Sequence, residues 1–143
     1  MPEVLAIEAA SFGSPWAEED FLRCLRAKSR IGMVAEANFG GPGGEKVVGF
    51  MIYELHKKRL EILNFAACPQ HRRLGVGRQM AAKLVGKLAS HRRTKLGLVV
   101  SDHNLGAHLF WRAMGFRATA VLRGHYEDTG QDGYRLEYRL RPG

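Results

Sequence analysis

The sequence predicts one mixed α/β domain, and three observations lead to this fold class. Apolar residues at helical spacing alternate along the chain with short runs rich in β-branched and aromatic residues. These segments follow the order helix, helix, three strands, helix, strand, helix and two strands, which favours a sheet flanked by helices. The 143 residues contain no internal repeat and no linker, and this length is enough to bury one core. We therefore expect a single domain over residues 1–143.

Two short helices are expected at the start of the chain. The first follows Pro2, carries apolar residues at helical spacing, and ends at the turn formed by residues 13–15. The second covers residues 17–27, where Phe21 and Leu25 belong to an apolar stripe. Its first turn is acidic, which suits the positive end of the helix dipole.

Three strands are expected next. Residues 31–37 and 47–55 are rich in strand-forming side chains, and the glycine-rich stretch 39–44 between them has the length of a hairpin loop. Residues 60–67 form the third strand. Pro69 blocks its continuation, because proline has no N–H to donate to a neighbouring strand.

The second half of the chain alternates helix and strand. Apolar residues at helical spacing predict an amphipathic helix after the third strand, and Gly115 closes a later helix that Asn104 opens. The turn-forming residues 128–133 predict a hairpin between the last two strands. The expected elements are helix 76–90, strand 96–100, helix 104–115, strand 117–126 and strand 134–140.

The formal net charge of +8 is compatible with several anionic partners but selects none of them. The basic residues are dispersed, and we recognise no nucleic-acid motif or aromatic platform among them. No apolar run approaches the roughly 20 residues that cross a bilayer, and the start lacks the pattern of a secretory signal. We therefore expect a cytoplasmic protein without direct contact to membrane or nucleic acid.

The two cysteines are expected to be reduced thiols. Cys24 and Cys68 form no spaced pattern with the six histidines, so no metal site is expected. A disulfide between them is the lesser alternative, because such bonds are rare inside the cell.

Gly75 and Gly77 lie where the third strand gives way to the following helix. A residue without Cβ lets backbone N–H groups approach an anion closely. The start of a helix adds donors without intrahelical acceptors and a partial positive charge, and Arg72, Arg73 and Arg78 add full charges. This segment predicts a phosphate site, with a plain tight turn as the alternative.

Two common phosphate motifs fit this segment poorly. A Walker-type loop requires four residues between its glycines and then Gly-Lys-Ser or Gly-Lys-Thr, which the chain lacks. A dinucleotide fingerprint requires a third Gly or Ala where Met80 stands. It also requires an acidic residue at the end of the next strand, and residues 96–100 contain none.

Taken together, the motifs resemble those of the GCN5-related N-acetyltransferases. Residues 72–77 match the family signature Arg/Gln-x-x-Gly-x-Gly/Ala. Residues 63–69 are similar to its splayed strand and following Val-x-Pro, and Asn104 with residues 110–116 is similar to its Asn…aromatic-Tyr-x-x-x-Gly-Phe pattern. The three motifs stand in the family's order and cover about residues 60–140.

Two more segments resemble one branch of that family, the bacterial ribosomal-protein alanine acetyltransferases (RimI type). Residues 7–16 match its Ile-Glu-x-x-Ser-Phe-x-x-Pro-Trp start, and residues 123–126 are similar to its Arg-Asn-Tyr-Tyr segment near the acceptor site. The resemblance implies a mixed, mostly antiparallel sheet with a central splay, flanked by helices. The family's first strand has no counterpart before Pro2, so a neighbouring chain could cover that edge. We expect a monomer or a weak homodimer.

The resemblance implies acetyl-coenzyme A (acetyl-CoA) as the acetyl donor, with no metal. Its pyrophosphate would lie on the amides of residues 73–78, and its pantetheine arm would pair with the backbone at Phe65 and Ala67. The N–H of Phe65 would stabilise the developing oxyanion. The cofactor-binding residues so implied are Phe65, Ala67, Arg72, Arg73, Leu74, Gly75, Val76, Gly77, Arg78, Asn104 and Trp111.

The catalytic residues depart from the RimI-type pattern. Those enzymes typically carry Glu and Tyr where this chain has Val99 and Trp111, and neither side chain here exchanges protons. Three residues are candidates to replace them. Glu61 lies in an otherwise apolar strand where histone-type relatives carry their catalytic Glu, and the alternative is a solvated strand charge. His71 has a side chain suited to a base, or is a loop histidine. Tyr126 is a proton donor, an acceptor-binding residue or a packed tyrosine.

The expected reaction is direct attack of a neutral amine on the thioester, which requires a base to deprotonate the ammonium. We expect the acceptor to be a protein N-terminal α-amine, with alanine of a ribosomal protein as a candidate. A small amine such as a polyamine or an aminoglycoside is the first alternative. A non-catalytic acyl-CoA-binding module and, from charge alone, a nucleic-acid binder are the others.

Overall fold

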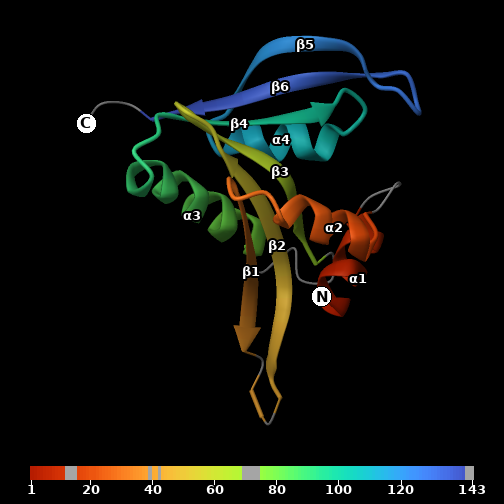
Figure 1. Ribbon diagram of the computed structural model, residues 1–143, viewed down its shortest axis with the longest axis vertical. Coiled ribbons are helices and arrows are strands. Elements are labelled where there is room, and N and C mark those ends of the chain that lie inside the picture. The colour runs from red at the N-terminus through yellow and green to blue at the C-terminus, as the bar shows by residue number, and fades with distance from the viewer. Residues whose placement is uncertain (12–15, 39, 42, 69–74, 141–143) are drawn as a thin grey trace. The chain divides into compact units, whose positions relative to one another are not determined.

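The computed structural model describes residues 1–11, 16–38, 40–41, 43–68 and 75–140, with side chains described outside residues 8–11 (Figure 1). Within these residues the ten predicted elements follow in the predicted order. They are α1 (Pro2–Ser11), α2 (Glu18–Leu25), β1 (Arg30–Asn38), β2 (Glu45–Leu55), β3 (Arg59–Ala67), α3 (Val76–Ser90), β4 (Lys95–Ser101), α4 (Leu105–Ala113), β5 (Arg117–Tyr126) and β6 (Gln131–Arg139).

The strands form one mixed sheet in the order β1-β2-β3-β4-β6-β5. The pairs β1–β2, β4–β6 and β5–β6 are antiparallel, whereas β3–β4 is parallel. The parallel pairing covers only Arg59–Lys95, Leu60–Leu96 and Glu61–Gly97, although both strands continue beyond it. This early end of the ladder is the central splay that the resemblance implies, and it confirms the predicted fold class.

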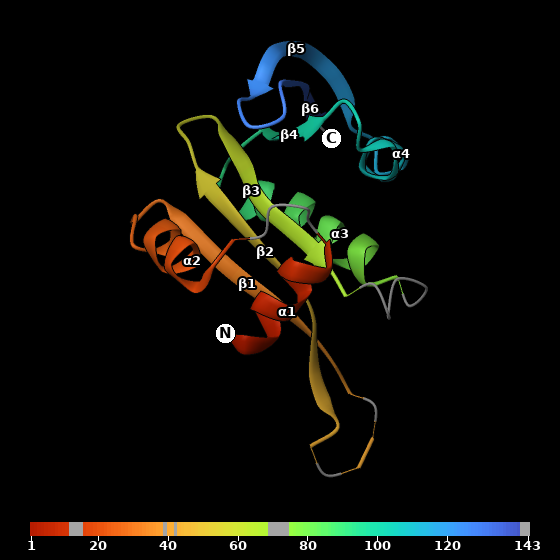
Figure 2. The same ribbon diagram turned by 90° about the vertical axis from the view of Figure 1, so that its right-hand side faces the viewer.

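The contacts group the chain into two compact units, which are described separately. Unit 1 comprises Met1–Leu55 and Ile62–Ala81. In it α1 packs on β2 and α2 packs on β1 (Figure 2). The apolar cluster between these helices and strands consists of Ile7, Phe21, Cys24, Phe50, Ile52 and Ala66. Asp20 accepts a hydrogen bond from the N–H of Ala17 at 2.9 Å, so a side chain of the first turn satisfies the backbone N–H of the residue that precedes α2.

Unit 2 comprises His56–Glu61 and Ala82–Gly143. One face of its strands is covered by α4, where the ring of Trp111 meets that of Phe116 edge-on with centroids 4.9 Å apart. Phe116 in turn contacts Tyr138 of β6. Gly115 ends α4 with a φ of 95°, a backbone conformation that favours glycine.

The structure corrects the predicted start of the last strand and confirms the prediction for the cysteines. The last strand begins at Gln131, three positions before the predicted start at residue 134, because Gln131 already pairs with Tyr126 across a shorter turn. Cys24 and Cys68 are free thiols, as expected, and burial raises the pKa of the Cys24 thiol. No helix in the described part of the chain is long and apolar enough to span a membrane.

Gly49 of β2 is a position of tight packing between three elements of unit 1. A Cβ at this position would lie 2.6 Å from Met80 Sδ, 3.1 Å from the Ala66 carbonyl oxygen and 3.2 Å from Val76 Cγ1. Glycine therefore lets β2, β3 and the first turns of α3 pack directly against one another.

We predict that Gly49→Ala lowers the free energy of unfolding by about 1–3 kcal/mol, the usual cost of overpacking a core. The measurement is urea unfolding followed by circular dichroism. Gly86→Ala is the matched control, because a Cβ on that exposed residue of α3 meets no atom within 4 Å. The control should be neutral or stabilising by up to about 1 kcal/mol, since alanine favours a helix. Equal effects in both variants would contradict the packing argument.

Candidate functional site

The start of α3 provides backbone donors of the kind that bind phosphate. Gly75 precedes the helix with a φ of 71°, and its carbonyl accepts the first intrahelical hydrogen bond, from Gln79 N at 3.0 Å. The N–H groups of Val76, Gly77 and Arg78 precede that bond, so the helix itself offers them no acceptor. His71, Arg72, Arg73 and Leu74 lie outside the described residues.

The end of β3, which carries Phe65 and Ala67, is held by a bulge in β2. Ala35 of β1 lies opposite Gly49 and Glu36 lies opposite Val47, so Val48 is an extra residue in the ladder. The carbonyl of Val48 accepts a hydrogen bond from the N–H of Cys68 at 2.7 Å. Bulges of this kind redirect a strand locally, and this one fixes the last residues of β3 in unit 1.

In unit 2 the predicted cofactor residues Asn104 and Trp111 have different environments. Asn104 is exposed and caps α4, because its Oδ1 accepts a hydrogen bond from Ala107 N at 3.1 Å. The turn before it is closed by the carbonyl of Ser101, which accepts from Asn104 N and from His108 Nε2. Trp111 is only 3% exposed, which favours a core aromatic over a ligand contact.

Glu61 lies in a bidentate ion pair with Arg135 of β6. Arg135 Nη2 donates to Glu61 Oε1 at 2.6 Å and Nη1 donates to Oε2 at 3.0 Å. Arg59 Nε lies 3.7 Å from Glu61 Oε1, and Arg135 Nε lies 3.6 Å from Glu137 Oε2. The hydrogen bond to Glu61 raises the pKa of the Arg135 guanidinium. Both oxygens of Glu61 thus accept charge-assisted hydrogen bonds from Arg135, so the carboxylate is already engaged by a partner within the protein.

The ion pair passes over Gly97 of β4. A Cβ on Gly97 would lie 2.9 Å from Glu61 Oε1 and 3.0 Å from Arg135 Nη2. Because Gly97 has no side chain, Glu61 of β3 and Arg135 of β6 can meet across β4. Val99, two residues further along β4, lies opposite Arg135.

Tyr126 ends β5 beside His125, and the two rings meet edge-on with centroids 4.9 Å apart. Burial raises the pKa of the Tyr126 hydroxyl. The phenol therefore stays protonated at neutral pH, which suits a proton donor rather than a base.

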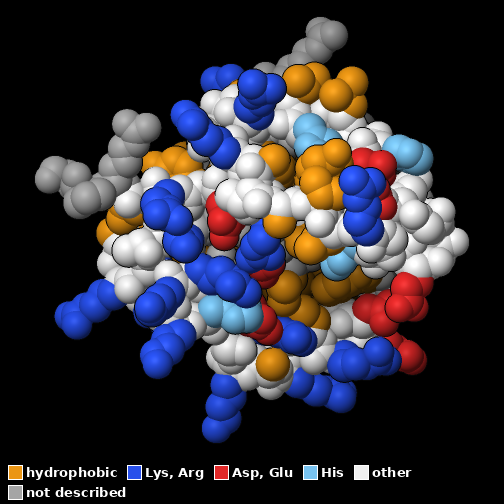
Figure 3. All heavy atoms as spheres, turned by 90° about the horizontal axis from the view of Figure 1, so that it is seen from above, with side chains coloured by type: hydrophobic (Ala, Val, Ile, Leu, Met, Phe, Trp, Pro, Cys, Tyr) orange, Lys and Arg blue, Asp and Glu red, His pale blue; other side chains and the backbone are white. Residues whose placement is uncertain are grey.

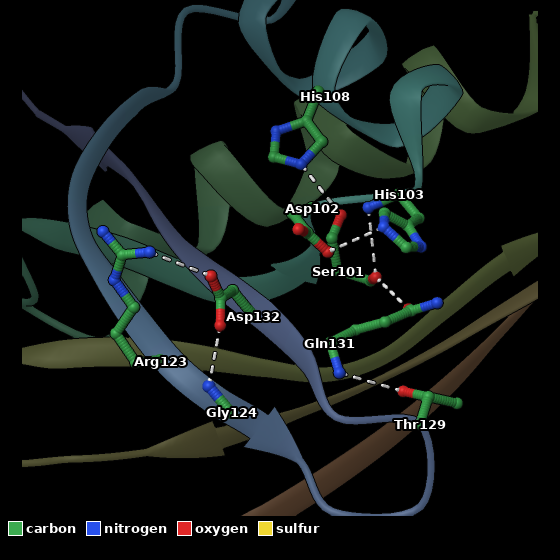
Figure 4. A network of polar contacts seen from close by, with 9 residues as sticks. All are labelled: Ser101, Asp102, His103, His108, Arg123, Gly124, Thr129, Gln131 and Asp132. Carbon is green, nitrogen blue, oxygen red and sulfur yellow. Dashed lines mark hydrogen bonds and ion pairs between the residues drawn. The ribbon is translucent and has the colours of Figure 1, made fainter.

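Sequence reasoning identified residues 123–126 but assigned a role only to Tyr126. In the structure this segment bulges out of β5, and Asp132 of β6 holds it (Figure 4). Asp132 Oδ1 accepts from Gly124 N at 2.8 Å, and Oδ2 accepts from Arg123 Nη1 at 3.4 Å. The bulge depends on a partner eight residues away, and no local sequence signal indicated it.

Charge and metal-binding groups give no competing site in the described residues. Lys and Arg side chains are spread widely over the face seen in Figure 3, with Asp and Glu among them. Among those residues, no group of three or more His, Cys, Asp or Glu could hold a metal ion.

We predict that Gly97→Ala lowers the free energy of unfolding by about 1–3 kcal/mol, because the new methyl group would displace the paired charges. The same substitution made in an Arg135→Met background should cost less than half as much, since the obstructed group is gone. Urea unfolding of the four proteins in this cycle gives the coupling energy. An equal cost in both backgrounds would show that the methyl group does not act through the ion pair.

Comparison with known proteins agrees with the motifs and the fold. The [Ribosomal protein bS18]-alanine N-acetyltransferase of Escherichia coli (strain K12) is 24% identical over 129 residues, which cover 90% of this chain and 82% of that protein. The crystal structure of the ribosomal-protein-S18-alanine N-acetyltransferase from Escherichia coli superimposes with a TM-score of 0.81 at 21% identity, covering 99% of this chain and 88% of the other.

A second solved structure has the same fold, a GNAT family acetyltransferase from Elizabethkingia anophelis with acetyl-CoA bound. It superimposes with a TM-score of 0.74 at 18% identity and covers 91% of this chain and 94% of that one. Residues 1–116 match the Acetyltransferase (GNAT) family. The chain therefore belongs to the GNAT family and is an N-acetyltransferase.

Proposed function

We propose that this N-acetyltransferase uses acetyl-CoA to acetylate the N-terminal α-amine of a protein, with alanine of a ribosomal protein as the leading acceptor. The main support for this acceptor is the similarity to the bS18-alanine N-acetyltransferase, which extends over 90% of this chain. The segment Arg123–Tyr126, which resembles the acceptor segment of that branch, supports the same assignment.

The proposed donor site in unit 1 combines the end of β3 with the start of α3. The amides of Val76, Gly77 and Arg78 offer donors and a partial positive charge to a pyrophosphate. Arg78 is exposed on the first turn and adds a full charge. The proposal includes Phe65 and Ala67 for the pantetheine arm, and it extends to Arg72, Arg73 and Leu74.

In the proposed reaction the acceptor amine attacks the thioester carbonyl after losing a proton, and coenzyme A leaves as a thiol. Two groups of unit 2 fit supporting roles. Tyr126 is a protonated phenol suited to donate to the departing sulfur, because burial raises its pKa. Asn104 is an exposed residue at the start of α4 that retains its amide N–H₂ for a ligand, since the capping bond uses only Oδ1.

We predict that Arg78→Ala raises the Kd for acetyl-CoA about tenfold, which corresponds to losing one charge-assisted contact of about 1.4 kcal/mol. Isothermal titration calorimetry at constant ionic strength measures this change. Lys83→Ala is the matched control, because it removes the same charge from an exposed position further along α3. The control should bind within about twofold of the unmodified protein. Equal weakening by both substitutions would show that only overall charge matters.

We predict that a peptide beginning with alanine is acetylated at least about tenfold faster than a polyamine or an aminoglycoside at equal concentration, since one missing set of specific contacts costs about 1.4 kcal/mol. Mass spectrometry of the products identifies the modified amine. The same peptide with a blocked N-terminus and one internal lysine is the control and should stay unmodified. Faster transfer to a small amine, or to the internal lysine, would overturn the proposed acceptor.

A further inference from the structure

The bulge in β5 is large and is fixed at defined points. Leu122 lies opposite Gly133 and Tyr126 lies opposite Gln131. Three residues of β5, Arg123 to His125, therefore span the single residue Asp132 of β6. Gly124 adopts a φ of 60°, which favours glycine. Both carboxylate oxygens of Asp132 bind the bulge. They fix the backbone of the bulge, although this segment is exposed.

The bulge places His125 over Gly133. A Cβ on Gly133 would lie 3.2 Å from His125 Cβ, 3.3 Å from His125 Cδ2 and 2.8 Å from Val99 Cγ1. The imidazole and Val99 therefore flank the bare backbone of Gly133 on one side of the sheet. In a regular strand, the alternation of side chains would set the direction of His125. The extra residues of the bulge set it instead.

His125 shares this face with the ion pair of Glu61. Gly133, Arg135 and Glu137 alternate along β6 and so point to the same face, and Arg135 meets Glu61 there. The opposite face carries Tyr134 and Tyr138, which contact His108 and Phe116. His125 is thus placed on the sheet face opposite α4, over Gly133.

The groups on this face differ in their ability to accept a proton. Both oxygens of Glu61 accept hydrogen bonds from Arg135, and Glu137 lies 3.6 Å from the same guanidinium. Val99 has no titratable group. His125 is exposed, and histidine is the side chain that changes charge between about pH 5 and 8.

We propose that His125 is the general base of acetyl transfer, held in place by Asp132 and Gly133. This inference rests on the proposed function, because it assumes an amine acceptor. The neutral imidazole takes one proton from the acceptor ammonium. The nitrogen lone pair then forms the C–N bond, and the C–S bond breaks with its electron pair on sulfur. Tyr126 gives its phenol proton to the thiolate and is reprotonated by the second proton that the nitrogen loses. Products are the amide, the thiol and one proton that the imidazole releases to solvent.

The charged neighbours of His125 make the expected pH dependence specific. Among the described residues, the titratable or charged neighbours of His125 on β5 and β6 include Arg123, Tyr126 and Asp132, and Arg135 lies two residues from Gly133 on the shared face. Arg123 and Asp132 form an ion pair, and Tyr126 remains a neutral phenol because burial raises its pKa. With His125 as the base, activity should fall as the pH is lowered, because a base that already carries a proton cannot accept another.

We predict that His125→Gln lowers kcat/KM for an N-terminal peptide about 10²-fold or more, the usual contribution of a general base. The Kd for acetyl-CoA should change less than about twofold, as expected for a residue outside the donor site. In the variant, only peptide whose α-amine is already neutral can react. The acidic limb of the pH profile should therefore shift to the pKa of the α-amine, about 8. Added imidazole should restore part of the rate in His125→Gly.

Three further variants separate catalysis from structure. His103→Gln replaces another exposed histidine of unit 2, with 67% side-chain exposure, and should keep the rate and the acidic limb. Asp132→Ala releases the bulge and Gly133→Ala displaces the imidazole; both should lower kcat while keeping the original acidic limb, because the base is misplaced but present. Thermal unfolding of each variant identifies any loss of fold, and imidazole rescue remains decisive if His125→Gln is destabilised.

The outcomes distinguish this inference from the proposed function. If the unmodified protein acetylates peptides or small amines but His125→Gln keeps its rate within about threefold and its acidic limb, His125 is not the base and the proposed function stands. If no primary amine is acetylated by the unmodified protein, both the proposed function and the base are overturned. A shifted limb with imidazole rescue supports the base whichever amine is preferred.

Discussion

The close approach of β2, β3 and α3 at Gly49 is the constraint on which the packing of unit 1 depends. Three elements meet where one side chain is missing, so the first turns of α3 pack against the strands through Met80 and Val76. This contact sets where the amides of Val76 to Arg78 lie relative to the end of β3. The bulge at Val48 completes the arrangement, because its carbonyl holds Cys68 immediately after β3. A phosphate site at a helix start requires such fixed donors, since mobile ones would lose entropy on binding.

The same principle operates in unit 2, where missing side chains make room for polar ones. Gly97 leaves room for the Glu61–Arg135 pair, and Gly133 leaves room for His125. Both glycines lie in strand interiors, where glycine is unfavourable by about 0.5–1 kcal/mol relative to alanine. Here that cost is offset by contacts between groups on different strands. The result is a face with one fully paired carboxylate and one exposed imidazole.

The two halves therefore support different levels of functional conclusion. Family membership and the fold establish an N-acetyltransferase, and the geometry at α3 agrees with a nucleotide-bearing donor. The proposed acceptor rests on the resemblance of a segment of unit 2, the same unit that contains Val99 and Trp111. Trp111 is buried in the core of its unit. In the proposed reaction, proton transfer is therefore assigned to groups outside these two positions, and Glu61 is already paired with Arg135.

The sequence alone determined the order and type of every described helix and strand, because each is marked by periodicity and by local end signals such as Asn104 and Gly115. It also determined the family, since the glycine turn and the Asn helix are contiguous motifs. Its assignments at His71, Arg72, Arg73 and Leu74 stay predictions, because these positions lie outside the described residues. Only the tertiary structure decided that Glu61 is paired, that β6 begins at Gln131, and that Asp132 folds His125 over Gly133. Those features join residues between 5 and 74 positions apart, and a single sequence carries no local signal for contacts made across strands.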